Sequence, residues 1–218
     1  MSQVNEKAPE LMVESWVQGE PSTIENEKGK VVLIEVFQVN CPGCFIYGLP
    51  EVIEIYNRYR DQPLTVWGLA TAFEDFDKNN LENLNKLVST GEVTGETYAA
   101  LSRANLLNFN KLQYLIPFPI AWDQLKKNPS EISTDRVQTI VQRDIDQFNS
   151  LPEKTQEMII NQVKAYLRQK IYDAQTFEAY GLRGTPSSIL IDKKGIFRYK
   201  LFGSEQGLEE NIKLLLAE

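Results

Sequence analysis

The residues of this sequence best suited to chemistry are Cys41 and Cys44, the only two cysteines among its 218 residues. Two residues separate them, at a point where an apolar, strand-like run gives way to a helix-like segment. The amides and the dipole of a helix's first turn favour an anion there, so a cysteine pKa can fall from about 8.5 to roughly 3.5–7.5. The pattern therefore predicts that a Cys41 thiolate attacks disulfides and that the more buried Cys44 resolves the mixed disulfide.

The two residues between the cysteines suit this position. Pro42 has a φ preset for a helix and no amide hydrogen to leave unpaired in the first turn. Gly43 keeps bulk away from the sulfur atoms. Apolar residues then recur at helical spacing as far as Arg60, which predicts a helix that packs on a sheet.

An apolar run at residues 31–37 precedes the cysteine turn and predicts a buried strand. A helix and a second apolar run, residues 64–71, follow it, and the right-handed crossover makes these two strands parallel. Glu35 is the one acid in the first run. Because burial of an unpaired charge is costly, we expect its carboxylate to lie beneath the cysteines with a raised pKa and to exchange a proton with Cys44. The alternative is that Glu35 faces solvent at a strand end.

The flanking segments also carry local signals. Residues 8–30 indicate a short strand or hairpin, and a helix is predicted from Asn79 to a stop at Gly91. Residues 94–108 indicate another short helix. The proline-rich residues 116–122 indicate a third strand. Near the end of the chain, two strands joined by a tight turn predict an antiparallel hairpin, followed by an amphipathic helix.

A long amphipathic section separates the third strand from that hairpin. Two apolar stripes predict a pair of helices packed as a helical hairpin, the second preceded by a Ser150-x-x-Glu153 capping box. We assign it as an insertion at residues 124–173 within a single domain of residues 1–218. Its stripes are interpreted as core, with binding of a partner as the alternative.

Composition and charge exclude several kinds of function. A net charge of −7 and a pI near 4.9 argue against a surface for nucleic acid, because phosphate binding depends on Lys and Arg. The absence of histidine excludes Ser-His and Cys-His dyads and histidine metal ligands. Two cysteines are too few for a zinc site within one chain, so we expect no metal and no cofactor. A metal shared by two chains is the alternative.

The apolar runs are too short for a membrane span of roughly 20 residues, and the first residues lack the basic and apolar regions of a secretory signal. We therefore expect a cytoplasmic protein, with a removed signal or anchor as the alternative. In a reducing compartment, a lone cysteine pair favours redox chemistry over a structural disulfide. The expected partners are protein disulfide substrates and an upstream thiol reductant, with neither nucleic acid nor a membrane span.

Several features together resemble the thioredoxin superfamily, and most closely its TlpA-like thiol-disulfide oxidoreductases. They are an apolar strand, a Cys-x-x-Cys helix, a second strand, a Gly-Thr-Pro sequence before a hairpin and a terminal helix. The likeness covers residues 8–11, 29–71 and 177–217. It implies a thioredoxin-like α/β fold, in which helices flank a central mixed β-sheet and a helical insertion precedes the cis-proline strand.

The resemblance also implies roles for individual residues. Cys41 attacks, Cys44 resolves, and Glu35 is the acid beneath them. Pro186 is a cis-proline that faces the disulfide and leaves the backbone of Thr185 free to pair with an extended substrate. An ordinary trans loop at this position is the alternative. The implied substrate-binding residues are Thr185, Pro186, Pro42 and Gly43.

Three features depart from the usual pattern of that family. Asn40 stands where tryptophan is common, and Pro42-Gly43 reverses the commonest order of these two residues. Pro50 falls one residue later than usual after the second cysteine, and the extra residue can be absorbed as a π-bulge. These departures bear on the redox potential and the choice of partner rather than on the reaction type.

Other functions remain open beside disulfide reduction. A peroxiredoxin shares the fold, but its Pro-x-x-x-Thr-x-x-Cys motif demands proline and threonine where this chain has Ile34 and Gln38. A redox sensor whose insertion moves when the disulfide forms is a further alternative. A non-catalytic binding module is another, although it has no need of two cysteines at this spacing.

Overall fold

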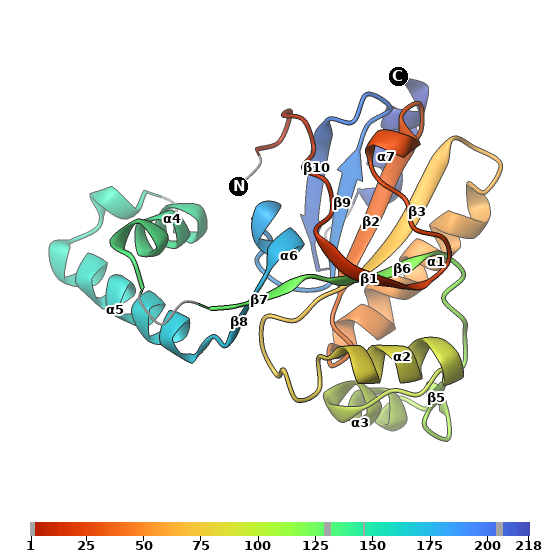
Figure 1. Ribbon diagram of the computed structural model, residues 1–218, viewed down its shortest axis with the longest axis horizontal. Helices are drawn as coiled ribbons and strands as arrows, with labels where there is room; N and C mark the ends of the chain where they lie inside the picture. The colour runs from red at the N-terminus through yellow and green to blue at the C-terminus, as the bar shows by residue number, and fades with distance from the viewer. Residues whose placement is uncertain (1–2, 129–131, 146, 204–206) are drawn as a thin grey trace. The chain divides into compact units, whose positions relative to one another are not determined.

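The structure is a computed structural model, and it describes residues 3–128, 132–145, 147–203 and 207–218 (Figure 1). The chain divides into two compact units. The larger one, which we call the sheet unit, combines Met1–Gln124 with Ala174–Glu218, and the smaller helical unit is Leu125–Asp173. The assignment of residues 124–173 as an insertion within a single domain stays a prediction. Of the helices in the described ranges, none combines the length and the apolar character that a membrane span requires.

The sheet unit is built around six strands in the order β1-β6-β3-β2-β9-β10. β3 pairs in parallel with both β2 and β6, whereas β1, β9 and β10 pair antiparallel with their neighbours. The predicted mixed sheet and the predicted terminal hairpin are therefore confirmed. The strands are β1 (Val13–Gln18), β2 (Val31–Phe37), β3 (Leu64–Ala70), β6 (Ile120–Asp123), β9 (Ser187–Ile191) and β10 (Phe197–Phe202).

β2 is the strand that leads to the cysteines, and all seven of its residues are buried. It lies between β3 and β9 in the middle of the sheet, so both of its faces are covered and its sequence shows no alternation of polar and apolar residues. β10, at the edge of the sheet, keeps several partly exposed residues. The chain therefore enters the cysteine turn from the most constrained strand of the unit.

Helical segments connect these strands (Figure 1). α2 confirms the predicted signals, because the Asn80 side chain accepts a hydrogen bond from Asn83 N and Gly91 ends the helix with a φ of +76°. A two-stranded hairpin, β4 (Leu107–Asn108) and β5 (Lys111–Leu112), follows α3. The helical segments are a 3-10 turn η1 (Glu25–Glu27), a π-helical turn η2 (Cys44–Gly48), α1 (Leu49–Arg58), α2 (Leu81–Thr90), α3 (Gly95–Arg103), α6 (Gln175–Ala179) and α7 (Leu208–Ala217).

Residues 8–30 contain the short strand that is one of the two predicted alternatives. It is β1, which pairs with β6 far along the chain rather than within a local hairpin. Two other predicted boundaries differ from the structure. The helix predicted over residues 94–108 ends at Arg103, because the following residues pair as β4 and β5. The third strand begins only at Ile120, because prolines at positions 117 and 119 cannot donate to a sheet.

Asp123, the last residue of β6, holds the start of α6. Its buried carboxylate accepts hydrogen bonds from Thr71 Oγ1 at 2.9 Å, Thr176 N at 2.9 Å and Phe177 N at 3.1 Å. Both amides belong to the first turn of α6, where N–H groups have no partner within the helix. Burial raises the pKa of Asp123 to about 6, against the lowering effect of these donors.

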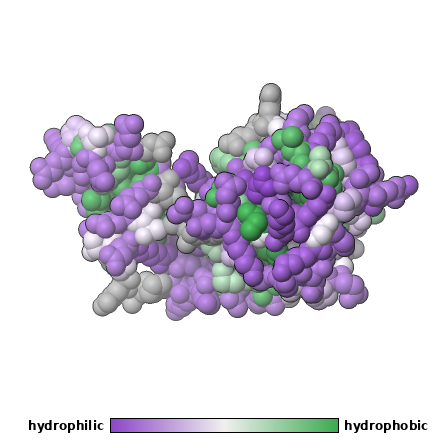
Figure 2. Space-filling view, turned by 90° about the horizontal axis from the view of Figure 1, so that it is seen from above, coloured by the Kyte–Doolittle hydropathy of each residue, from purple (hydrophilic) through white to green (hydrophobic). Residues whose placement is uncertain are grey.

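The helical unit contains the two predicted helices, α4 (Thr134–Asp144) and α5 (Glu153–Gln169). Their apolar stripes face each other, with Val137, Val141 and Leu167 as the buried core, so the interpretation of these stripes as core is confirmed. Some apolar side chains also reach the surface of this unit, where green appears among the polar residues in Figure 2. Its other elements are η3 (Phe148–Ser150) and the paired strands β7 (Leu125–Lys127) and β8 (Tyr172–Ala174).

The predicted capping box at Ser150 and Glu153 is wrong. α5 begins at Glu153 with Pro152 as its N-cap, and no side chain caps it. Ser150 instead ends the short 3-10 turn, and its hydroxyl donates to the carbonyl of Gln147 at 2.7 Å. The fixed φ of proline suits a helix start, so the helix begins after Pro152 and leaves Ser150 outside it.

Candidate active site

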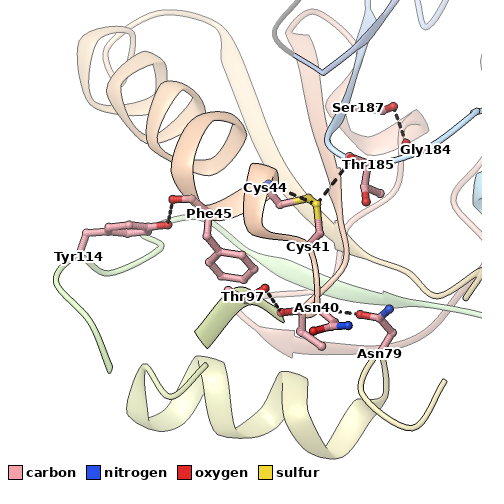
Figure 3. Close-up of a disulfide and its surroundings, with 11 residues drawn as sticks. Asn40, Cys41, Cys44, Phe45, Asn79, Thr97, Tyr114, Gly184, Thr185 and Ser187 are labelled. Atoms are coloured by element: carbon pink, nitrogen blue, oxygen red, sulfur yellow. Dashed lines mark hydrogen bonds between the residues drawn. A yellow bond between two sulfur atoms is a disulfide. The ribbon is translucent and has the colours of Figure 1, made fainter. Parts of the chain in front are cut away.

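Cys41 and Cys44 stand where the chain passes from β2 into a helical segment, and a disulfide bond joins them (Figure 3). Cys41 is partly exposed, whereas Cys44 is fully buried. Their Cα atoms are 5.4 Å apart, and the Cys44 amide nitrogen lies 3.3 Å from Cys41 Sγ. An amide aimed at the Cys41 sulfur favours its thiolate once the bond is reduced. This is the geometry that an attacking Cys41 and a resolving Cys44 require.

The bond between Thr185 and Pro186 is cis, so the predicted cis-proline is confirmed. The carbonyl oxygen of Thr185 lies 3.5 Å from Cys41 Sγ (Figure 3). Pro186 also packs against the helical segment. A Cβ added at Gly43 would lie 3.7 Å from Pro186 Cδ, whereas one added at Gly48 would lie only 2.7 Å from Pro186 Cβ. Gly48 therefore allows the cis-proline to approach the helix, and a larger residue at position 43 fits at ordinary contact.

The helical segment begins at Pro42 and contains the π-helical turn before α1, which confirms the predicted π-bulge. In this turn the amide of Leu49 donates to the carbonyl of Cys44, five residues back. Pro50 has no N–H to donate to the Phe45 carbonyl in the same pattern. The hydroxyl of Tyr114 donates to that carbonyl at 2.9 Å (Figure 3). A distant tyrosine thus supplies a donor that the local sequence lacks.

Glu35 lies on β2 with no exposed surface, so the alternative in which it faces solvent is wrong. Ser188 Oγ donates to Glu35 Oε2 at 2.6 Å, and the two residues are register partners of β2 and β9. Among the described residues, Glu35 Oε1 has no hydrogen-bond partner. Burial raises the pKa of Glu35 to about 8, against the lowering effect of the Ser188 hydrogen bond. A carboxyl group with a pKa in this range can exchange a proton near neutral pH.

Gly48 links Glu35 to the turn that carries Cys44. A Cβ at Gly48 would overlap Glu35 Oε1, so the carboxyl group lies directly against this residue. Gly48 is the last residue of the π-helical turn that begins with Cys44, so Glu35 lies against the same turn that carries the second cysteine. The structure thus brings three predicted elements together, namely the cysteine pair, the acid on β2 and the cis-proline before β9.

The chain has relatives of known structure, although no family model and no curated protein sequence matches it. A thiol-disulfide isomerase from Corynebacterium glutamicum is 26% identical over 98% of this chain and 97% of that chain, with a TM-score of 0.58. A thioredoxin-like superfamily protein is 26% identical over 97% of each chain, with a TM-score of 0.57. A thioredoxin-like protein in the oxidised form, 17% identical over 95% of each chain with a TM-score of 0.51, shows the fold alone.

The chain has a thioredoxin-like fold. The predicted resemblance to the thioredoxin superfamily is therefore confirmed, together with the α/β class and the central mixed sheet. With Cys41 and Cys44 in place, this thioredoxin-like fold is of the thiol-disulfide oxidoreductase type.

Asn40 connects the cysteine turn of this thioredoxin-like protein to α3. Its Oδ1 accepts from Glu96 N at 2.7 Å, and its Nδ2 donates to Asp75 Oδ2 at 3.0 Å. Figure 3 shows its third hydrogen bond, in which its backbone N donates to Asn79 Oδ1 at 2.8 Å. Gly95 fits beside it because a Cβ there would overlap the Asn40 amide. The sequence marked Asn40 only as a departure from tryptophan, since a cap for a helix so far along the chain leaves no local signal.

A cavity of about 170 Å³ lies between the cysteine-bearing segment and α2 of the thioredoxin-like unit. Small-molecule sites usually measure about 300–1,000 Å³, so this cavity fits a single side chain or a few waters. Apolar and polar side chains line it in equal number. The lining residues are Val39, Phe45, Leu87 and Val93, with Asn83, Lys86, Glu92 and Thr94.

Proposed function

We propose that this protein is a TlpA-like thiol-disulfide oxidoreductase that reduces or exchanges disulfides in protein substrates. The observation that carries the proposal is the Cys41–Cys44 disulfide at a helix start beside a cis-proline, with the buried Glu35 against Gly48 of the turn that begins with Cys44. The similar structure described as a thiol-disulfide isomerase supports the reaction class. We place the reaction in the cytoplasm, as the sequence predicts, with an upstream thiol as reductant.

The reaction begins with the reduced protein. The Cys41 thiolate attacks one sulfur of the substrate disulfide, so a bond between Cys41 and the substrate forms while the other substrate sulfur leaves as a thiolate and takes a proton from water. The Glu35 carboxylate then accepts the proton of the Cys44 thiol. Cys44 Sγ attacks Cys41 Sγ and releases the second substrate thiolate. Two electrons pass to the substrate, and the Cys41–Cys44 disulfide that remains awaits reduction by the upstream thiol.

The proposed substrate-binding residues surround the exposed side of Cys41. An extended substrate segment pairs with the backbone of Thr185, in the manner of an added strand, and the ring of Pro186 packs beside it. Pro42 and Gly43 border the same sulfur, and the absence of a side chain at Gly43 leaves room for the substrate. This arrangement recognises the backbone of a polypeptide, which favours protein substrates of varied sequence.

Two other functions are weaker alternatives. Peroxide reduction lacks its motif, because Ile34 and Gln38 replace the required proline and threonine. Gln38 is buried, and its Oε1 accepts from Phe73 N at 3.0 Å, so its side chain fixes a loop. A redox sensor or binding module is the other alternative. A sensor would use the same disulfide without turning over substrates, which distinguishes it from the enzyme.

Insulin reduction with a dithiol as reductant tests the proposal. The wild-type protein should accelerate the reaction, and Cys41→Ser should abolish the acceleration. Cys44→Ser is the matched variant, because it keeps the attacking thiol and removes the resolving one. It should accumulate mixed disulfides through Cys41, identifiable by mass. Wild-type inactivity would contradict the enzyme and favour the sensor, and trapping through Cys44 instead of Cys41 would reverse the assigned roles.

A further inference from the structure

Ser188 is a buried serine that has no role in the proposed reaction as described above. It lies on β9 opposite Glu35 on β2, and its hydroxyl donates to Glu35 Oε2 at 2.6 Å. A serine hydroxyl has one proton to donate, so this hydrogen bond commits it to a single carboxylate oxygen. The neighbouring Ser187 donates to the carbonyl of Gly184 at 2.8 Å and thus serves the loop instead. Only one of these two adjacent serines acts on the acid.

We propose that Ser188 is the positioning residue of Glu35: its hydroxyl occupies Oε2 and leaves Oε1 as the oxygen that accepts the proton of Cys44. The inference rests on the proposed function and adds a residue to it. Three observations carry it: the short Ser188 hydrogen bond, the lack of a partner for Oε1 among the described residues, and the contact of Oε1 with Gly48.

The orientation of the carboxyl group follows from these contacts. An oxygen that accepts a hydrogen bond from Ser188 is the poorer site for a proton, so protonation occurs at Oε1. Oε1 lies against Gly48, the last residue of the π-helical turn that begins with Cys44. If Ser188 did not hold Oε2, rotation about the last side-chain bond would let either oxygen face the turn.

Few charged groups shift the pKa of Glu35 beside the hydrogen bond from Ser188. On β3 the register partner of Glu35 is Gly68, which carries no charge. On α1 the carboxylate of Glu51 raises the pKa of Glu35, a smaller effect than burial or the Ser188 hydrogen bond. On η2 the buried ionisable group is the Cys44 thiol of the reduced protein, whereas Tyr47 is exposed to solvent. Loss of the serine hydroxyl should therefore be visible in the titration of Glu35.

In the proposed step the proton moves from the Cys44 sulfur to Glu35 Oε1. Once the mixed disulfide at Cys41 has formed, the S–H bond of Cys44 breaks and an O–H bond forms at Glu35 Oε1, while Ser188 continues to donate to Oε2. The Cys44 sulfur then forms the bond to Cys41 Sγ, and the substrate thiolate leaves. The proton on Oε1 returns to solvent when the carboxyl group ionises again before the next turnover.

Infrared titration of the Glu35 carboxyl band, assigned by its absence in Glu35→Gln, tests the hydrogen bond directly. In Ser188→Ala the titration should move upward by roughly one to two pH units, because a hydrogen bond to the ionised form is lost. The pH at which disulfide reduction reaches half its maximal rate should move by the same amount. Ser188→Thr should restore both, and Ser187→Ala, the matched control, should leave the Glu35 band unchanged. Should Ser188→Ala fail to fold, Ser188→Thr and Ser188→Val make the same comparison, because they differ only by the hydroxyl.

The outcomes separate this inference from the proposed function. An unchanged Glu35 titration in Ser188→Ala, in a protein that reduces insulin, overturns the inference and leaves the function intact. A shifted titration with an unmoved pH profile also overturns it, because Ser188 then orients an acid that does not serve Cys44. If the wild-type protein reduces no disulfide, both the inference and the proposed function are overturned, even where Ser188→Ala shifts the Glu35 titration. Parallel shifts of the band and the profile support it.

Discussion

Glu35 and Asp123 are both buried carboxylates on strands of the same sheet, but their surroundings differ in the number of donors. Asp123 accepts hydrogen bonds from a hydroxyl and two backbone amides, and both of its oxygens are occupied. Glu35 accepts one hydrogen bond, and within the described part of the chain its Oε1 has no partner. Burial raises the pKa of Asp123 to about 6 and that of Glu35 to about 8.

The difference shows how one sheet can hold a structural acid and a reactive acid. Hydrogen-bond donors directed at a carboxylate stabilise its ionised form. If such an acid is removed, each of these buried donors is left without an acceptor, and the folded state loses stability. Asp123 meets this description, since it closes the first turn of α6. An oxygen without a donor leaves a carboxyl group able to take up and release a proton, as we propose for Glu35. The following predictions test this contrast.

Glu35→Gln should give the largest effect, and it should fall on activity. The glutamine oxygen can still accept from Ser188, but an amide cannot take up the proton of Cys44. We expect disulfide reduction to fall by roughly 10²-fold to 10⁴-fold, the usual range for a lost acid–base group. Below pH 4.5, where the Glu35 carboxyl is protonated in both the folded and the unfolded chain, the free energy of unfolding should change by no more than about 1 kcal/mol, since a single hydrogen bond is kept or weakened. Insulin reduction and urea denaturation measure the two quantities, and a variant that keeps wild-type rates would show that Glu35 is structural like Asp123.

Asp123→Asn should show the opposite pattern. An asparagine amide presents a donor in place of one carboxylate oxygen, so at least one amide of the first turn of α6 loses its acceptor. We expect the free energy of unfolding to fall by roughly 2–4 kcal/mol. Insulin reduction at a temperature where the variant is folded should stay close to the wild-type rate. A folded variant that loses activity without losing stability would remove the distinction between the two acids.

The contrast also explains which parts of the site the sequence could predict. The buried strand before Cys41, the π-bulge required by Pro50 and the cis bond before Pro186 all have local signals, either a run of apolar residues or a short motif. The hydrogen bonds made by Asp123, Asn40 and Tyr114 have no such local signal. These side chains meet partners 53, 56 and 69 residues away, and single polar pairs leave no periodicity in a sequence.

Local signals also fail where a stronger local constraint overrides them. The pattern Ser150-x-x-Glu153 fits a capping box, but the proline between these residues fixes the helix start after itself. The same principle limits the third strand, where prolines delay pairing until Ile120. The sequence therefore predicts the elements that carry the site, and the tertiary structure decides how their polar groups are satisfied.

The two acids should lower the stability of the folded protein over different ranges of pH. The pKa of Glu35 is raised from 4.5 to about 8 in the folded protein, so the unfolded chain releases its proton first and stability falls as pH rises through this window. The corresponding window for Asp123 runs from 3.8 to about 6. Between pH 6 and pH 8, the loss due to Glu35 alone is roughly 2–3 kcal/mol. Urea denaturation of the oxidised protein should show this loss in wild type and in Asp123→Asn, and its persistence in Glu35→Gln would assign it to another group.

The smallest effect should come from Tyr114→Phe, which removes one hydrogen bond from the reactive region. The Phe45 carbonyl would lose the donor that replaces the missing N–H of Pro50, so we expect a cost of about 1–2 kcal/mol in the free energy of unfolding. Tyr180→Phe is the matched control, because the Tyr180 hydroxyl donates at 2.6 Å to the carbonyl of Pro9, in a loop that carries no reactive residue. Both variants should lose similar stability.

Only Tyr114→Phe should also change the equilibrium between the dithiol and the disulfide, because the turn that it supports begins with Cys44. Redox titration against mixtures of reduced and oxidised dithiothreitol measures this equilibrium. We expect the equilibrium constant of Tyr114→Phe to change by roughly twofold to tenfold. A lost hydrogen bond that contributes up to about 1.4 kcal/mol to this equilibrium changes the constant by up to about tenfold. Equal equilibrium constants in the two variants would mean that the π-turn holds its shape without Tyr114, and that packing of Gly48 against Pro186 is enough to keep Cys44 in place.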